Sequence, residues 1–168
     1  MKKTLSLLII AIIALTSSIN ANAWTDRNTF NLKGPVKSVQ DKFNYEFLEF
    51  EENGDIIFEG DPHIFGGTID RDSRSRITYM AGEQFTYNSK GQVIKIIENT
   101  PSGPNTYKYI YNSKGQVIKE VSADAEDEYR ITTTYTYQKF DSYGNWIKRT
   151  AKNKYGTKVE TRTITYYE

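Results

Sequence analysis

The strongest constraint on this chain is a nine-residue string that occurs twice without a single change. The sequence YNSKGQVIK begins at Tyr87 and again at Tyr111. An internal repeat of this kind is typical of a fold in which one supersecondary unit recurs along the chain. The repeat therefore has to be explained before any other feature.

Three weaker copies of the same unit lie elsewhere in the chain. They span residues 50–57, 71–77 and 140–147, and the second of them carries Ser75 where the others have glycine. A further turn is expected at residues 154–157. The predicted turn glycines are Gly54, Gly91, Gly115 and Gly144.

The residue types in each unit predict a β-hairpin. An Asn or Asp opens the turn, because its side chain accepts a hydrogen bond from the backbone two residues further on. The glycine three residues later supplies the left-handed conformation that ends a type I turn in a bulge. This geometry pairs Asn88 with Gln92 and places Tyr87 opposite Val93. Replacing a turn glycine by alanine is expected to cost about 1 kcal/mol, and the turn at Ser75 is expected to be distorted or of another type.

The segments between the turns read as strands. Tyr107, Tyr109 and Tyr111 alternate with other residue types, as in a strand with two different faces. After each turn two apolar residues follow one another, as in Val93-Ile94, so both faces carry apolar groups there. These patterns predict an all-β fold, an antiparallel meander of repeated β-hairpins with about ten to twelve strands in a curled, partly closed sheet.

Four local expectations accompany this fold. In the last unit Tyr135 and Tyr137 are out of step with Phe140 in the alternation of aromatic residues. This break predicts a β-bulge near residues 138–139. Two prolines make residues 100–105 an open loop, because proline cannot donate to a ladder. Residues 25–33 hold a single helical turn at most. The acidic stretch 122–128 is expected to be a solvated connection rather than a calcium site.

The first 23 residues have the pattern of a signal peptide. Lys2 and Lys3 precede an apolar run from Leu5 to Leu15, and Ala21-Asn22-Ala23 has the small-x-small form of a signal peptidase site. An apolar run of about 11 residues is too short to remain as a membrane anchor. We therefore expect cleavage after Ala23, a single hairpin-repeat domain at residues 24–168, and a secreted or periplasmic location without a membrane anchor.

Composition excludes several classes of function. The chain has 22 Lys and Arg against 21 Asp and Glu, and cleavage removes only two lysines, so the mature chain is almost neutral and lacks an electrostatic footprint for nucleic acid. It has no cysteine, and His63 is its one histidine, so zinc sites and nucleophile–histidine triads lack their side chains. We predict no catalytic residue, no metal and no cofactor.

The aromatic residues supply the candidate binding site. The chain contains 13 Tyr, 8 Phe and 2 Trp, all after residue 23. The candidate residues are Tyr107, Tyr109 and Tyr111, with Trp146 from a later strand. Their rings offer a ligand apolar surface, and each ring carries an O–H or N–H group that can form a hydrogen bond. Cross-strand aromatic pairs also stabilise sheets directly, and the pattern by itself favours a core role. The tyrosine hydroxyls are the argument for an accessible surface.

The unit from Tyr111 to Val117, with Asn112 and Gly115 inside it, resembles the YD repeat of Rhs-type proteins. In that repeat an aromatic residue and an Asp precede a turn glycine, and here Asp fills the second position in two units and Asn in two others. The resemblance implies a hairpin array over most of the chain. The chain is more similar to small secreted bacterial proteins with a few such hairpins than to long Rhs arrays that enclose a toxin.

These features favour an exported, non-catalytic binding or interaction module whose partner is a glycan, a peptide or an envelope protein. Two alternatives stay open. One is a carboxylate-dependent glycan hydrolase, which two acidic residues about 5 to 10 Å apart in one cleft would favour. The other is a structural envelope component that associates with copies of itself through its sheet edges.

Overall fold

The computed structural model describes residues 24–41, 47–57, 68–125 and 130–168. The expected signal peptide, His63 and residues 126–128 of the acidic connection lie outside these ranges. One sheet of twelve antiparallel strands makes up most of the described chain. The strands are β1 (Val36–Asp41), β2 (Phe47–Phe50), β3 (Ile56–Ile57), β4 (Ile69–Arg71), β5 (Ile77–Met80), β6 (Glu83–Tyr87), β7 (Val93–Thr100), β8 (Gly103–Tyr111), β9 (Val117–Ala123), β10 (Ile131–Phe140), β11 (Trp146–Asn153) and β12 (Gly156–Tyr166).

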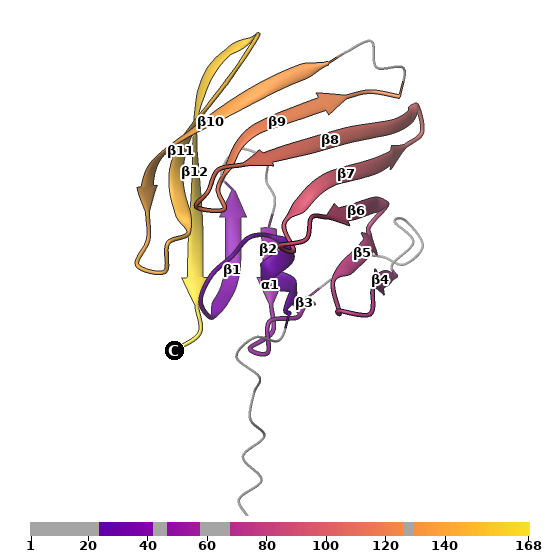
Figure 1. The fold of residues 1–168 in the computed structure, drawn as a ribbon. Coiled ribbons are helices and arrows are strands. Elements are labelled where there is room, and N and C mark those ends of the chain that lie inside the picture. Colours follow the sequence, from indigo (N-terminus) through magenta and orange to yellow (C-terminus); the bar gives the residue numbers. More distant parts are fainter. Residues whose placement is uncertain (1–23, 42–46, 58–67, 126–129) are drawn as a thin grey trace, which may run out of the picture.

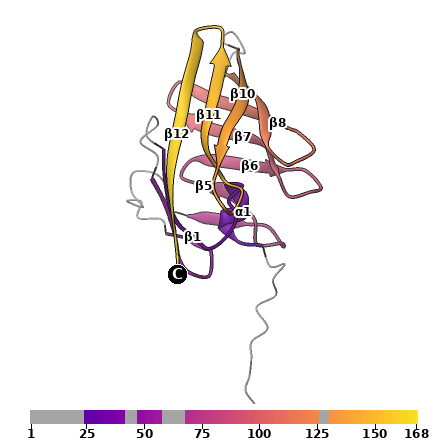
Figure 2. The same cartoon turned by 90° about the vertical axis from the view of Figure 1, so that its left-hand side faces the viewer.

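Consecutive strands pair with each other from β4 to β12, and β1, β2 and β3 continue the sheet beyond β12. The two edges of the sheet, β3 and β4, therefore follow each other in the chain. The sheet is strongly curled (Figure 1), so that β10, β11 and β12 stand in front of β5 to β8 when the molecule is viewed from the side (Figure 2). The predicted antiparallel meander of hairpins in a curled sheet is confirmed.

The five repeat turns share one backbone conformation. The four predicted glycines have φ from 78° to 98°, and Ser75 has φ 62°. The Ser75 N–H donates to the Asp72 carbonyl at 2.9 Å and the Asp72 N–H to the Arg76 carbonyl at 3.0 Å, as in the glycine turns. The prediction of a distorted turn at Ser75 is wrong. The Asp72 carboxylate accepts the N–H groups of Arg74 and Arg76, and these bonds offset the strain of a left-handed serine.

Each exact repeat also contains a β-bulge. The register jumps by one residue beyond the turn, which leaves Ile94 and Ile118 without a cross-strand partner. These are the second members of the adjacent apolar pairs, and a bulge takes them out of the regular alternation while it bends the strand. The last unit has register shifts between Tyr137 and Phe140, so the bulge predicted near residues 138–139 is confirmed.

The connection between β7 and β8 is tighter than the open loop expected over residues 100–105. Asn99 pairs with Pro104, and only residues 101–102 form the turn. The Asn99 N–H points away from β8 and donates to the Gly82 carbonyl at 3.1 Å. Pro104 therefore occupies a position at which the ladder requires no donor, which is why the prolines do not open the hairpin.

A short N-terminal segment closes the end of the sheet at which the repeat turns lie. This N-terminal plug, residues 24–35, contains the four-residue helix α1 (Asp26–Thr29), which lies between the strands in Figure 1. The helix agrees with the expectation of a single turn at most. Trp24 packs on Gly91 and Thr25 on Gly54, so that an alanine Cβ at either glycine would come within 2.7 Å of the plug side chain.

The plug reaches two further repeat turns through hydrogen bonds. Asn31 Nδ2 donates to the Gly115 carbonyl at 3.2 Å. The Asn145 side chain accepts from the Lys33 N–H and donates to the Lys33 carbonyl, both at 2.8 Å. Asn145 directly follows the turn glycine of the last repeat and is almost fully buried. Turns far apart in the sequence are therefore held together by one short segment.

Asp26 of the plug joins the two edges of the sheet. Its side chain is fully buried. The carboxylate accepts the Ile56 N–H of β3 at 2.9 Å and forms an ion pair with Arg71 of β4, in which Arg71 Nη2 lies 2.8 Å from Oδ2. Arg71 also donates to the Ser75 carbonyl at 3.2 Å. We call this arrangement the Asp26 clasp, because it connects β3, β4 and the Ser75 turn.

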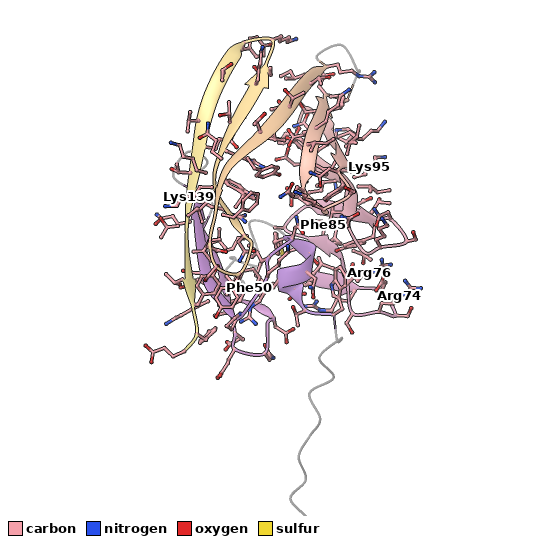
Figure 3. The ribbon with its side chains drawn as sticks, turned by 60° about the vertical axis from the view of Figure 1, so that its left-hand side comes forward. Phe50, Arg74, Arg76, Phe85, Lys95 and Lys139 are labelled. Carbon is pink, nitrogen blue, oxygen red and sulfur yellow. The ribbon has the colours of Figure 1, made fainter. Side chains whose placement is uncertain are left out.

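The hydrophobic core lies at the plug end. It consists of two clusters, one containing Val36 and Phe50 and the other Ile77 and Phe85, and Phe30 of the plug packs against both. Figure 3 shows Phe50 and Phe85 on the inner side near α1, whereas its labelled lysines and arginines lie at the outside. Within the described ranges no helix is long and apolar enough to cross a membrane.

Candidate functional site

The concave face of the sheet encloses a cavity of about 1350 Å³. Tyr107, Tyr109 and Tyr111 from β8 and Trp146 from β11 all line it, and each of them is half-buried. The structure thus brings all four candidate residues to one surface, although two strands separate β8 from β11. The curvature of the sheet, rather than closeness in sequence, makes them neighbours.

The three tyrosine hydroxyls of β8 have different environments. Tyr111 Oη donates to the Val93 carbonyl at 2.6 Å, and Tyr107 Oη donates to the Glu98 carboxylate at 2.9 Å. Burial and this hydrogen bond raise the pKa of Tyr107 to about 12. Tyr109 Oη makes no hydrogen bond to any residue in the described ranges, and burial followed by the charge of Glu120 raises its pKa. Tyr109 therefore offers its hydroxyl to the cavity.

The Tyr111 contact belongs to a series that recurs along the repeats. In each case a side chain donates to the carbonyl of the second residue after a turn glycine or Ser75. A bulge follows each of these positions and leaves the carbonyl outside the regular ladder, so it needs another donor. The pairs are Tyr87 to Ile77, Tyr111 to Val93, Tyr137 to Val117 and Arg162 to Trp146, at 2.6 to 2.7 Å.

Trp146 holds two arginines in the cavity wall. The guanidinium carbons of Arg149 and Arg162 lie 4.2 and 4.1 Å from the centre of its ring, and Arg149 also lies 3.9 Å from the ring centre of Tyr135. Such contacts stabilise a partly desolvated cation through the ring quadrupole. Burial, and then the charge of Arg149, lowers the pKa of Arg162 to about 10. Trp146 contributes to the cavity mainly by positioning these two cations.

Two carboxyl groups line the same cavity. Tyr135 Oη donates to Glu120 at 3.0 Å, and Arg149 Nε donates to Glu160 at 2.7 Å. Burial raises the pKa of Glu120, and the Tyr135 hydrogen bond and the charge of Arg149 act in the opposite direction. A linked polar system therefore runs across the cavity wall from Glu120 on β9 to Glu160 on β12.

Sequence reasoning did not identify Glu120, because the register depends on the bulge. Counting back from the turn in a regular hairpin places Lys119 opposite Tyr109. The bulge at Ile118 shifts the register by one residue and brings Glu120 opposite Tyr109 instead. Tyr135 could have been identified from the sequence, because it belongs to a regular alternation of Thr and Tyr in the segment that becomes β10.

Comparisons with known proteins identify neither a family nor a relative of this chain. No protein-family model matches the chain, and no curated protein matches it either. Among the residues that the structure describes, no group of three or more His, Asp or Glu side chains could hold a metal ion. The resemblance of the turn unit to the YD repeat stays a prediction.

Proposed function

We propose that this chain is an exported, non-catalytic binding module that takes a glycan or a peptide into the cavity on the concave face of its sheet. One observation carries the proposal: all four candidate aromatic residues line a single cavity of about 1350 Å³. Sites for drug-sized molecules typically enclose about 300–1,000 Å³, so this cavity suits an oligomeric ligand. Aromatic rings combined with a few polar groups are typical of such sites.

The packing of the aromatic residues supports a binding role over a core role. The two hydrophobic clusters surround the plug, and only Tyr109 of the four candidates packs against one of them. Tyrosines in a core usually bury their hydroxyls in hydrogen bonds. Tyr109 Oη has no such partner in the described chain, which favours a surface that meets a ligand.

The test is a binding screen with the protein purified from bacteria that express the full chain. Panels of oligosaccharides and peptides are titrated by calorimetry, and each hit is measured again with Tyr107→Leu. Tyr79→Leu is the matched control, because Tyr79 lies on β5 and does not line the cavity. Loss of binding in Tyr107→Leu alone is the expected result. Equal affinity of both variants, or no ligand in either panel, contradicts the proposal.

A hydrolase acting on glycans is the second candidate, favoured by the presence of Glu120 and Glu160 in one cavity. The raised pKa of Glu120 suits a general acid, which donates its proton to the leaving oxygen while a second carboxylate activates water. Release of reducing ends from a glycan panel tests this candidate. Activity that disappears in Glu120→Gln supports it, and activity unchanged in Glu120→Gln excludes this pair.

Self-association through sheet edges is less well supported. The edge strands β3 and β4 contain two and three residues, and short edges are a known means of limiting pairing between chains. The Asp26 clasp also occupies the Ile56 N–H of β3. A monomer in size-exclusion chromatography over a wide concentration range is the expected result.

Export after cleavage at Ala23 is part of the proposal. Trp24, the residue that follows the predicted site, already packs on Gly91 and meets the Tyr87 ring edge-on at 5.8 Å. The residue at the predicted start of the mature chain is therefore already packed against the sheet, which supports cleavage at this position. Intact mass spectrometry of the periplasmic protein checks this, with a mature chain that starts at Trp24 as the expected outcome.

A further inference from the structure

Three cavity residues on neighbouring strands form a straight row across the concave face. Tyr109 of β8 is directly opposite Glu120 of β9, and Glu120 is directly opposite Thr133 of β10. The Cβ atoms of such opposed residues lie about 4.5–5.5 Å apart on the same face of a sheet. All three residues line the cavity. We call this set the acceptor row.

The acceptor row has polar atoms without protein partners. Thr133 exposes only 8% of its surface, and its hydroxyl makes no hydrogen bond within the described ranges, as is also true of Tyr109 Oη. Glu120 receives one hydrogen bond, from Tyr135 at 3.0 Å, and its second oxygen receives none from the described residues. None of these three atoms is enclosed by protein, because Trp24 Nε1 is the one buried side-chain polar atom without a partner among the described residues. Their unused hydrogen-bonding capacity lies in the cavity lining and is available to a ligand.

The charges around the acceptor row favour a cation. Burial raises the pKa of Tyr109, and the two charged groups that raise it further are the carboxylates Glu120 and Glu83. The cation whose charge lowers the pKa of Glu120 is Arg149 of β11, and Arg149 is itself paired with Glu160 of β12 at 2.7 Å. The negative potential at the row is therefore only partly compensated by the protein.

We propose that the acceptor row binds the ammonium group of an amino sugar within an oligosaccharide, an inference that rests on the proposed binding function of the cavity. An ammonium group has three donors and no acceptor. It therefore matches a carboxylate flanked by two hydroxyls, whereas an acetylated amine has one donor and no charge. The rings of Tyr107 and Tyr111 flank Tyr109 on the same face of β8 and offer apolar area to the neighbouring sugar rings.

The inference is tested by calorimetric titration of the purified protein at mildly acidic pH, at which the amines of a glucosamine oligomer are protonated. Two probes are compared: a glucosamine tetramer and the N-acetylglucosamine tetramer of the same length. Because hydrogen bonds to charged groups are stronger than those between neutral groups, the glucosamine tetramer is expected to bind about tenfold more tightly or better. Glu120→Gln, which keeps an oxygen for Tyr135, is expected to remove this preference.

Two further variants ensure that the test does not depend on a single substitution, which could disturb the fold. Thr133→Val and Tyr109→Phe each remove one hydroxyl at nearly constant shape, and each is expected to weaken the glucosamine tetramer several-fold. Glu51→Gln is the matched control, because Glu51 is exposed and does not line the cavity. Thermal unfolding of each variant verifies that the fold is intact.

The outcomes separate this inference from the proposed function. Equal affinity for the two tetramers, with Glu120→Gln unchanged, overturns the ammonium assignment and leaves the cavity as a glycan site. Binding of a lysine-rich peptide without binding of either tetramer overturns the assignment to a sugar. Failure of every ligand in the wider panels overturns the proposed function itself.

Discussion

The two ends of the curled sheet, one around the plug and the other around the acceptor row, differ in how their polar side chains are bonded. At the plug end, the buried Asp26 carboxylate has partners on β3 and β4, and the buried Asn145 amide is bonded on both of its polar atoms. At the cavity end, Tyr109 and Thr133 keep their hydroxyls free of protein partners in the described chain. One atom departs from this contrast: Trp24 Nε1 of the plug is the one buried side-chain polar atom without a hydrogen-bond partner among the described residues.

This difference separates stability from function within one repeat architecture. The plug end contains the contacts that hold the repeat turns together and most of the hydrophobic core. Members of both hydrophobic clusters also line the cavity, namely Leu32, Val39, Met80, Phe85 and Val93. The cavity end contains space, aromatic rings and unpaired acceptors, which are poor for stability and suited to a ligand. Substitutions at the plug end should therefore lower the stability of the protein most, whereas those in the acceptor row should mainly change binding.

The largest expected effect comes from Asp26→Asn. Removing one partner of a buried ion pair leaves the other uncompensated, and we expect a loss of about 3 kcal/mol in the free energy of unfolding. Urea denaturation of the purified protein measures this loss. Asp70→Asn is the matched control, since Asp70 is exposed on β4 and should change stability by less than about 0.5 kcal/mol. Equal midpoints for both variants would mean that the Asp26 clasp does not hold the edges.

A second comparison uses the two identical repeats. Gly91 and Gly115 have φ of 80° and 78°, so alanine at either costs about 1 kcal/mol from the backbone alone. The new Cβ would lie 2.6 Å from the Trp24 ring at Gly91, and 3.2 Å from the end of the flexible Gln92 side chain at Gly115. We expect Gly91→Ala to lower the free energy of unfolding by about 1–2 kcal/mol more than Gly115→Ala does.

Denaturant unfolding of both glycine variants measures this difference. Gly91→Ala combined with Trp24→Ala serves as the control, because the ring contact is then absent. Similar losses of stability for Gly91→Ala and Gly115→Ala would show that the contact between Trp24 and Gly91 does not restrict the side chain at this turn.

The next effect compares two tyrosines of the same strand. Tyr111→Phe removes the hydrogen bond to the Val93 carbonyl and should cost about 1 kcal/mol. Tyr109→Phe removes a hydroxyl without a partner in the described chain and should change stability by less than about 0.5 kcal/mol. Thermal unfolding distinguishes the two. A larger loss in Tyr109→Phe would reverse the assignment of structural and ligand-facing hydroxyls.

The smallest effect is a pH dependence of Glu120. Its folded-state pKa is raised above the ordinary 4.5, chiefly by burial, so the folded state binds the proton more tightly than the unfolded state. Stability from this group is therefore present below pH 4.5 and is lost as the pH rises through the folded-state pKa. Glu120→Gln should raise the melting temperature at pH 7 and change it less at pH 4. The opposite order would mean that Glu120 is stabilised as a carboxylate.

The repeating hairpin could be predicted from the amino-acid sequence, because the residues that specify it are close neighbours in the chain. The Asn or Asp that opens each turn, the glycine three residues later and the alternating strand residues act within a few positions of one another. The pairing of Tyr87 with Val93 and the bulge near residues 138–139 followed from that local chemistry. The four aromatic candidates could be placed on strands, but their common surface could not be derived.

Features that depend on contacts between distant segments could be seen only in the folded chain. The edges of the sheet meet because Asp26 contacts both of them, at Ile56 and at Arg71. Glu120 faces Tyr109 only after a one-residue bulge, and no local rule gives the side on which a bulge falls. Curvature then gathers side chains from β8 to β12 around one cavity, since small bends at successive bulges add up over many strands.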